Sequence, residues 1–352
     1  MKGLILSGGF GTRLRPLTYS RQKQLIPVAN KPIIFYAIED LIEAGIKDIG
    51  IIVGPNKEQV IETVNNASWD ANIEFIEQNQ PLGIAHTIKI SKDFLGEEPF
   101  LMYLGDNILK EGVVDHVKAF ENSGYDGSIM LNDVDNPEEF GIAVLNENDE
   151  IEQLIEKPKN PPSNHAVIGV YMFSPKIHEA VKNLKPSKRG QLEITDAVQW
   201  LIDNGHKVKS AFVNNWWKDT GKPEDILHAN RLILDDIKSN NLGKILDSKI
   251  RGRVEIGENT VVENNSLVKG PTIIGENCKI KGSYIGPYTS IGDNCEIIDT
   301  ELEDTVILDS SIIRNGGRIV DSLIGREVKI VKKDGLPNGK RFVIGDNSEV
   351  SI

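Results

Sequence analysis

The stretch 256-IGENTVVENNSLVKGPTIIGENCKIKGSYI-285 decides the fold of the C-terminal part of this chain. An aliphatic residue opens each hexad, at positions 256, 262, 268, 274 and 280. The spacing falls to five at Ile285 and returns to six at Ile291 and Ile297. A six-residue period is typical of a left-handed parallel β-helix, in which three hexads complete one coil. A β-sandwich would alternate with a period of two, so the hexads favour the β-helix.

The first four hexads carry a small residue four positions after the aliphatic one, where it fits a corner of the coil: Thr260, Ser266, Thr272 and Cys278. The hexads IGENCK and IGDNCE place Cys278 and Cys295 there, and their leading residues Ile274 and Ile291 are 17 positions apart. We therefore expect the two cysteines to stack on successive coils. A strand spacing of about 4.8 Å would permit a disulfide. Parallel side chains and a reducing compartment oppose it, so we expect free, buried thiols.

The chain before the hexads alternates apolar runs with amphipathic segments. The segment 32–45 begins with Pro32 and ends with Gly45, which predicts a helix. Strand and helix signals that alternate in this way predict an α/β domain with a mostly parallel sheet, which binds ligands at the carboxyl ends of its strands. The predicted strands are 3–7, 48–53, 73–77, 99–104, 128–133, 142–145, 167–173 and 208–213.

The polar stretch SNNLGK, residues 239–244, separates the two patterns. We therefore predict an α/β domain at 1–238 and a hexapeptide-repeat β-helix domain at 245–352. A chain of 352 residues is long enough for both to have a full core.

Charge and composition narrow the class of partner. The net charge of −12 argues against nucleic acid and anionic membranes, so an anionic substrate needs a local cluster of cations. The sequence contains no run of 18 apolar residues and enters its first strand directly, so we expect neither a membrane span nor a signal peptide. Two cysteines in a chain of this length favour the cytoplasm.

The loop LSGGFGTRLRP, residues 6–16, follows the first apolar run. A glycine-rich turn after a strand predicts a phosphate site. Neither common phosphate motif fits, because Thr12-Arg13 follow the last glycine where a P-loop needs Lys and Ser or Thr. The third glycine of the dinucleotide fingerprint is replaced by Leu14.

Several charged residues are candidates for chemistry. Asp106 ends an apolar strand and Asp219 follows another, and carboxylates at strand ends near a phosphate loop are natural magnesium ligands. The alternative for Asp106 is that it caps a turn. Arg13 lies inside the glycine loop, whereas Lys23 and Lys157 could also be solvated surface charges or members of exposed salt bridges.

Nine motifs occur in order across residues 1 to about 235. They are GGFGTRLRPLT, QKQLIPVANKP, NQPLGIAHTI, LGDN, EFGIAVL, EKP, AVIGVYMFS, RGQLEITD and WWKDTGKP. This set resembles the motifs of the sugar-1-phosphate nucleotidylyltransferases. Within that family the chain is similar to members that use dTTP and glucose 1-phosphate and carry a hexapeptide-repeat tail. The resemblance implies a Rossmann-like nucleotidyltransferase domain.

The resemblance also implies roles for individual residues. Catalytic residues would be Arg13, Lys23, Asp106, Lys157 and Asp219. Asp106 and Asp219 would hold Mg²⁺. The nucleotide-binding residues would be Leu6, Gly8, Gly9, Gly11, Thr12, Arg13, Gln80, Gly83 and Asp106. The sugar-phosphate-binding residues would be Gly141, Glu156, Lys157 and Gly169.

Three functions stay open at this point. The first is thymidylyl transfer, which needs no general base because a phosphate monoester has a second pKa of about 6. The second is a UTP-using relative that could also carry an acetyltransferase on its β-helix. Hexapeptide acyltransferases usually use a histidine, and all six histidines lie before residue 229. The third is a non-enzymatic subunit. We expect a homo-oligomer and a β-helix that supports assembly.

Overall fold

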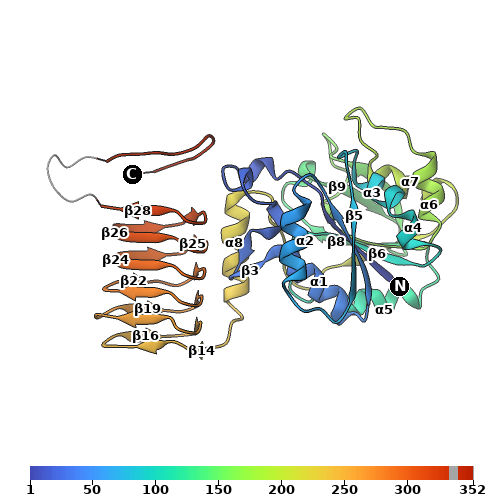
Figure 1. Cartoon of the computed structure of the whole chain (residues 1–352). Coiled ribbons are helices and arrows are strands. Elements are labelled where there is room, and N and C mark those ends of the chain that lie inside the picture. The colour runs from blue at the N-terminus through green and yellow to red at the C-terminus, as the bar shows by residue number, and fades with distance from the viewer. Residues whose placement is uncertain (333–339, 352) are drawn as a thin grey trace. The chain divides into compact units, whose positions relative to one another are not determined.

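The computed structural model describes residues 1–332 and 340–351, and the chain divides into two compact units (Figure 1). The sheet unit contains Met1–Phe10, Arg21–Leu25 and Ile33–Asp219. The β-helix unit contains Gly11–Ser20, Ile26–Pro32 and Thr220–Ile352. The domain boundary at 239–244 stays a prediction, and residues 333–339 and 352 of the predicted second domain lie outside the described residues.

The sheet unit is built on a nine-stranded sheet with the order β10-β9-β11-β6-β1-β4-β5, in which β8 joins β11 and β12 joins β8. Strand β1 (Lys2–Ser7) pairs in parallel with β4 (Asp48–Val53) and β6 (Phe100–Leu104), and β4 pairs in parallel with β5 (Asn72–Glu77). β1, β4 and β6 are nearly continuous apolar runs because helices cover both faces of the sheet.

Strand β11 (His165–Phe173) runs antiparallel to β6, β8 and β9 and so adds a mixed half to the parallel one. The remaining strands are β8 (Gly127–Asp133), β9 (Gly141–Leu145), β10 (Ile151–Glu156) and β12 (Val208–Phe212). A separate two-stranded ladder joins β7 (Asn107–Leu109) to β13 (Trp217–Asp219).

The helices of the sheet unit bury apolar faces on opposite sides of the sheet. Ala85 of α3 and Val198 of α7 belong to one core cluster, whereas Ala37 of α1 and Val64 of α2 belong to the other. The helices are α1 (Ile33–Glu43), α2 (Lys57–Asn65), α3 (Ile84–Ile90), α4 (Lys92–Leu95), α5 (Val114–Glu121), α6 (Ile177–Asn183) and α7 (Ile194–Asp203). Short 3₁₀ helices cover Thr12–Leu14, Leu17–Tyr19, Lys23–Leu25 and Pro137–Glu139.

The β-helix unit is a stack of parallel rungs, which Figure 1 shows beside α8 (Pro223–Leu234). Each strand pairs with the strand one coil later, so that Ile256, Ile274, Ile291, Ile307 and Ile324 form one inward column. The coils between them contain 18, 17, 16 and 17 residues. The predicted fold class, including a β-helix, is confirmed.

The short strands of the coils lie along the hexad repeat. A hairpin of β2 (Pro27–Val28) and β3 (Lys31–Pro32) also belongs to this unit. The coil strands are β14 (Asn240–Asn241), β15 (Lys244–Ile245), β16 (Lys249–Arg251), β17 (Val254–Ile256), β18 (Val261–Glu263), β19 (Leu267–Lys269), β20 (Thr272–Ile274), β21 (Lys279–Lys281), β22 (Tyr284–Ile285), β23 (Thr289–Ile291), β24 (Glu296–Glu303), β25 (Val306–Ile307), β26 (Ile312–Val320), β27 (Leu323–Ile324) and β28 (Lys329–Val331).

The predicted corner residues form a buried column. The Thr260 hydroxyl donates to the Gly275 carbonyl (2.6 Å) and accepts from the Cys278 N–H (2.9 Å) on the next coil. The Cys295 N–H lies 3.4 Å from the Cys278 Sγ one coil further on. Both cysteines are free and buried, as predicted.

No helix within residues 1–332 and 340–351 is long and apolar enough to cross a membrane.

Candidate active site

Two predicted catalytic carboxylates are brought together by the short β7–β13 ladder. Asp106 precedes β7, and the antiparallel register places Asp219 opposite Asn107. The Trp217 Nε1 donates to the Asn107 Oδ1 (2.5 Å), and the Asn107 Nδ2 donates to the Asp106 Oδ1 (3.0 Å). This chain of hydrogen bonds fixes the orientation of the Asp106 carboxylate.

Lys23 lies between these two carboxylates. Its Nζ is 2.5 Å from the Asp106 Oδ2 and 3.8 Å from the Asp219 Oδ1. The side chain of Lys23 is only 8% exposed, so its charge needs compensation by nearby anions. The neighbouring Gln22 donates from Nε2 to the carbonyls of Ser7 (2.9 Å) and Gly9 (2.7 Å), which ties the Lys23 segment to the end of β1.

This pair of carboxylates fits a divalent cation. Mg²⁺ is usually held by one or two carboxylates, with waters and substrate phosphates as its other ligands. Asp106 and Asp219 already converge on one positive group, and both are partly exposed. Within the described part of the chain, no group of three or more His, Cys, Asp or Glu residues could hold a metal without such help.

The start of the glycine loop in the sheet unit is closely packed. A Cβ at Gly8 would lie 3.0 Å from the Gln78 Oε1, and a Cβ at Gly54 would lie 2.7 Å from the Gly8 carbonyl oxygen. Gly9 has open space beside it, and Leu6 is buried in β1. The sequence did not predict that Gln78 and Gly54 contact Gly8, because each of them reaches it from the end of a different strand.

The other predicted loop residues belong to the β-helix unit. Gly11 has a left-handed backbone (φ 60°), and Thr12 and Arg13 follow it as exposed residues of a 3₁₀ helix. Their contact with phosphates stays a prediction.

Gln80 lies beside a small cavity. The cavity has a volume of about 260 Å³ and is lined by Glu77, Asn79, Gln80, Leu82, His86 and Ile90. The His86 Nδ1 is 3.1 Å from the Gln78 Nε2, which connects this cavity to the packing beneath Gly8.

Gly83 has a structural reason that the sequence did not reveal. Its φ is 107°, and a Cβ there would lie 2.4 Å from the Leu192 carbonyl oxygen. The Leu192 N–H donates to the Leu82 carbonyl (2.7 Å), so residues 82 and 192 are held together by backbone. Gly83 therefore permits this close approach, and its predicted place beside a nucleotide base stays a prediction.

Glu156 and Gly141, two predicted sugar residues, lie opposite one another in the β9–β10 ladder. Arg189 was not predicted as a site residue, although it lies within RGQLEITD. Its Nη2 is 3.0 Å from the Glu156 Oε1 and 2.9 Å from the Glu193 Oε2. The structure thus places an extra cation beside the predicted sugar site.

Lys157 and Gly169 both have a left-handed backbone. Lys157 (φ 45°) is exposed, and its N–H donates to the Phe140 carbonyl (3.0 Å). Gly169 (φ 85°) packs against the end of β6, where a Cβ would lie 2.6 Å from the Leu104 Cδ1 and 3.1 Å from the Asn107 Nδ2. A side chain at 169 would therefore clash with Leu104 and crowd the Asn107 amide, which donates a hydrogen bond to Asp106.

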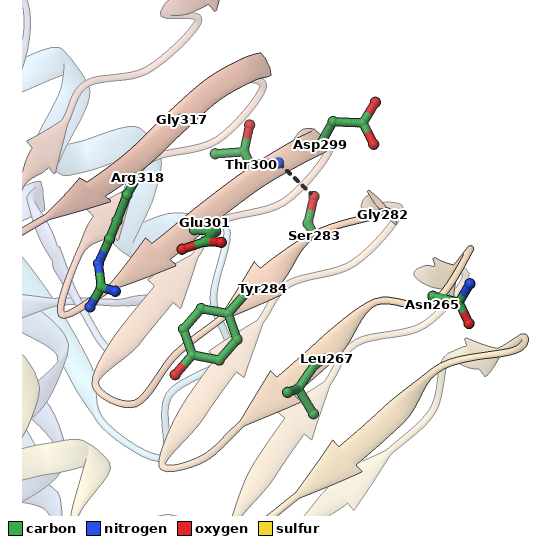
Figure 2. A pocket seen from close by; sticks show the side chains of 10 residues that line it. All are labelled: Asn265, Leu267, Gly282, Ser283, Tyr284, Asp299, Thr300, Glu301, Gly317 and Arg318. Atoms are coloured by element: carbon green, nitrogen blue, oxygen red, sulfur yellow. Dashed lines mark hydrogen bonds between the residues drawn. The ribbon is translucent and has the colours of Figure 1, made fainter.

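A second hollow lies on the outer face of the β-helix, with a volume of about 750 Å³. Figure 2 shows the side chains of Leu267, Tyr284, Glu301 and Arg318 on successive strands, where the register makes them direct neighbours. None of the predicted site residues lines this hollow.

The sheet with its glycine loop, the paired carboxylates and the buried lysine define the class. The chain belongs to the nucleotidyl transferase family, whose sequence profile matches residues 2–236, and the predicted family is confirmed. Nucleotidyl transferases of this family generally use a divalent metal.

Individual relatives are similar over the whole chain. A low-salt glycan biosynthesis nucleotidyltransferase, Agl11, from Haloferax volcanii is 47% identical over 357 residues, with 100% of both chains covered. A glucose-1-phosphate thymidylyltransferase from Streptomyces griseus is 45% identical over 354 residues, covering 100% of this chain and 99% of the relative. A crystal structure described as a glucose-1-phosphate thymidylyltransferase from Bacillus anthracis superposes with a TM-score of 0.62 at 36% identity, covering 68% of this chain and 98% of that one.

Proposed function

We propose that this nucleotidyltransferase moves a thymidylyl group from dTTP to glucose 1-phosphate, which gives dTDP-glucose and pyrophosphate. The observation that carries the proposal is the position of Lys23 between Asp106 and Asp219 at the carboxyl ends of the strands. Full-length identity of 45% to a thymidylyltransferase supports the choice of substrates.

The reaction is an in-line displacement at the α-phosphorus of dTTP. An oxygen of the sugar phosphate forms a bond to this phosphorus while the bond to the bridging oxygen breaks, and that oxygen leaves with pyrophosphate. The nucleophile is already ionised near neutral pH, because its second pKa is about 6. The protein therefore has to bring two polyanions together and stabilise the spread charge.

The catalytic residues divide this work by charge. Lys23 lies 2.5 Å from Asp106 and is available to the pyrophosphate end of the nucleotide. Arg13 is assigned to the same end from its motif. Lys157 binds the phosphate of the sugar, and Glu156 accepts hydrogen bonds from sugar hydroxyls. Arg189, 3.0 Å from Glu156, joins this group as a further cation.

Asp106 and Asp219 would hold Mg²⁺, which when bound neutralises charge on the phosphates of the nucleotide. The glycines at 8, 9 and 11 let backbone N–H groups approach those phosphates. Gln80 pairs with the edge of the base beside Gly83, and Gly141 and Gly169 leave room for the hexose.

We also propose that the protein acts in the cytoplasm as a homo-oligomer, and that the β-helix supports its assembly. A bifunctional acetyltransferase is disfavoured, because the sequence after residue 228 contains no histidine to act as a base.

The test is pyrophosphate release with dTTP, UTP, ATP, CTP and GTP against a panel of sugar 1-phosphates. The expected result is highest kcat/KM for dTTP with glucose 1-phosphate. Preference for UTP would move the assignment to a uridylyltransferase, and no pyrophosphate release with any pair would overturn it.

A further inference from the structure

The chain enters and leaves the β-helix unit on both sides of Lys23. Gly11–Ser20 precede the lysine segment and Ile26–Pro32 follow it, and both segments are grouped with the β-helix, whereas Arg21–Leu25 belong to the sheet unit. Residue 26 is three positions from Lys23, which is at most about 10 Å of extended chain. Whatever holds residues 26–32 therefore restricts where Lys23 can go.

Asn230 of α8 holds this segment to the β-helix. Its side chain is 1% exposed and makes three hydrogen bonds. The Oδ1 accepts from the Ala29 N–H (2.9 Å) and the Ser290 hydroxyl (2.6 Å), and the Nδ2 donates to the Tyr288 carbonyl (2.9 Å). One buried amide thus joins the β2–β3 turn, α8 and one coil of the β-helix.

The β2–β3 turn also contacts the coil directly. Asn30 has a φ of 60°, a conformation that Asn tolerates better than most residues, and its Nδ2 donates to the Ile291 carbonyl (2.6 Å). The preceding Ala29 has a φ of 47°, which is uncommon for alanine. The two positive φ values aim the Ala29 N–H and the Asn30 side chain at α8 and the coil.

Helix α8 is itself fixed on the coil, so the network cannot shift with the turn. The Arg231 Nε donates to the Asp304 Oδ1 (2.8 Å), and its Nη2 donates to the Asp321 Oδ1 (2.8 Å). Leu227 packs in one cluster with Val306 and Leu308. The helix therefore contacts three successive rungs through polar and apolar side chains.

We propose that the β-helix positions the nucleotide end of the active site, and that Asn30, Asn230 and Ser290 are the positioning residues that transmit its rigidity to the segment after Lys23. This inference rests on the proposed thymidylyl transfer, and it gives the β-helix a part in turnover in addition to assembly. Loosening the network should weaken the hold on triphosphate and pyrophosphate, which Lys23 contacts, and should spare the sugar phosphate.

Two variants with matched controls test this in the full-length protein. Asn30→Gly keeps the backbone conformation and removes the bond to Ile291, and Asn277→Gly makes the same exchange at an exposed coil residue with φ 55°. Ser290→Ala removes one donor to Asn230, and Ser283→Ala removes a serine that is also buried, 4% exposed, and bonded only within the coils.

The measurements are KM for dTTP, for pyrophosphate in the reverse direction and for glucose 1-phosphate. In Asn30→Gly and Ser290→Ala we expect the first two to rise about fivefold, which is about 1 kcal/mol at 1.4 kcal/mol per factor of ten. KM for glucose 1-phosphate and both controls should stay near wild type. Unchanged KM for dTTP, or an equal rise in the controls, would overturn the inference.

Hydrogen exchange supplies a readout that does not depend on turnover. Amides of residues 21–32 should exchange faster in Asn30→Gly and Ser290→Ala than in Asn277→Gly and Ser283→Ala. Equal exchange in all four would overturn the inference, whereas a wild-type protein without transferase activity would overturn only the proposed function.

Discussion

The sheet unit and the β-helix unit use unusual backbone positions in opposite ways. In the β-helix the left-handed residues recur at equivalent corners of successive coils, and one such series is Asn259 (φ 59°), Asn277 (55°) and Asn294 (58°). In the sheet unit Gly83 and Gly169 each have a different reason, and both border the candidate site. The repeated positions therefore belong to the scaffold of the β-helix, whereas Gly83 and Gly169 are each required by a separate close contact beside the candidate site.

The ion pairs of the two units also differ, in how far they are exposed to solvent. Lys23 is nearly buried between two carboxylates, whereas the Arg314–Glu296 pair of the β-helix has an arginine that is 50% exposed. Exposed pairs contribute about 0–1 kcal/mol to stability. Cavity volume does not indicate which unit carries the candidate site. The hollow of about 750 Å³ lies on the β-helix, whereas the cavity beside Gln80, in the sheet unit, has a volume of about 260 Å³.

The largest effect should come from Asp106→Asn. This change removes one negative charge from the proposed metal site and the closest partner of Lys23, so we expect kcat to fall about 100-fold or more. Pyrophosphate release over a range of Mg²⁺ concentrations measures it. Glu301→Gln removes a carboxylate from the β-helix hollow and serves as the control, with near-normal turnover. A near-normal rate in Asp106→Asn at limiting Mg²⁺ would sink the site assignment.

A smaller effect is expected from Gln80→Ala. The loss of one hydrogen bond to the base should raise KM for dTTP about fivefold, equivalent to about 1 kcal/mol, and should relax the choice between dTTP and the other nucleotides. KM for glucose 1-phosphate in the same variant is the internal control. If nucleotide preference does not change, the base is bound away from the cavity beside Gln80.

Lowering the pH should reduce the free energy of unfolding of the two units in different pH ranges. Burial lowers the pKa of His86, His116 and His178 from the ordinary 6.5. The unfolded chain then binds more protons, so this part of the stability falls as the pH drops below about 6.5. In the β-helix, the hydrogen bonds from Arg314 lower the pKa of Glu296 from the ordinary 4.5, so that contribution is lost only below about pH 4.5.

Tryptophan fluorescence can separate these ranges, because all four tryptophans lie in the sheet unit, at positions 69, 200, 216 and 217. Between pH 7 and 5 the fluorescence midpoint of thermal unfolding should fall more than the midpoint of the β-helix signal in circular dichroism. His178→Phe should reduce this fall, since its ring stacks on Phe100 with centroids 6.2 Å apart. An unchanged fall would assign the acid sensitivity to other groups.

The smallest expected effect is the response of the two thiols in the native protein. Both cysteines are buried, at 2% and 1% exposed, so a thiol reagent cannot reach either of them in the folded protein. The contact with Cys295, together with burial, also raises the pKa of Cys278. Thiol titration should therefore detect neither cysteine before unfolding and both after unfolding without reductant. Fewer than two thiols after unfolding would mean that a disulfide forms between the coils.

The sequence predicted those structural features that depend on the spacing of apolar residues along a short segment. The run 48–53 coincides with β4, the helix predicted at 32–45 contains α1, and the spacing of 17 between Ile274 and Ile291 is the observed register. The hexad pattern blurred after Ile297 because the coil from Ile291 to Ile307 is only 16 residues long.

What the sequence did not reveal depends on residues far apart in the chain. Nothing near Lys23 indicates that it meets Asp106, which lies 83 positions away, or that Arg189 reaches Glu156 from 33 positions away. Asn230 looks like an ordinary helical residue until its partners 58 and 60 positions later are known. Such contacts are set by tertiary packing, which no periodicity encodes.

The contacts of α8 with three successive rungs restrict where the β-helix can gain or lose a coil during evolution. Each coil contacts only its neighbours, so whole coils can be gained or lost one at a time. Asn230 and Arg231 are adjacent on α8, yet their partners Tyr288, Asp304 and Asp321 lie on successive coils. An extra coil within 288–321 would separate these partners, whereas one added after Ile324 would leave them in place. Homologues of different length should therefore vary outside that interval.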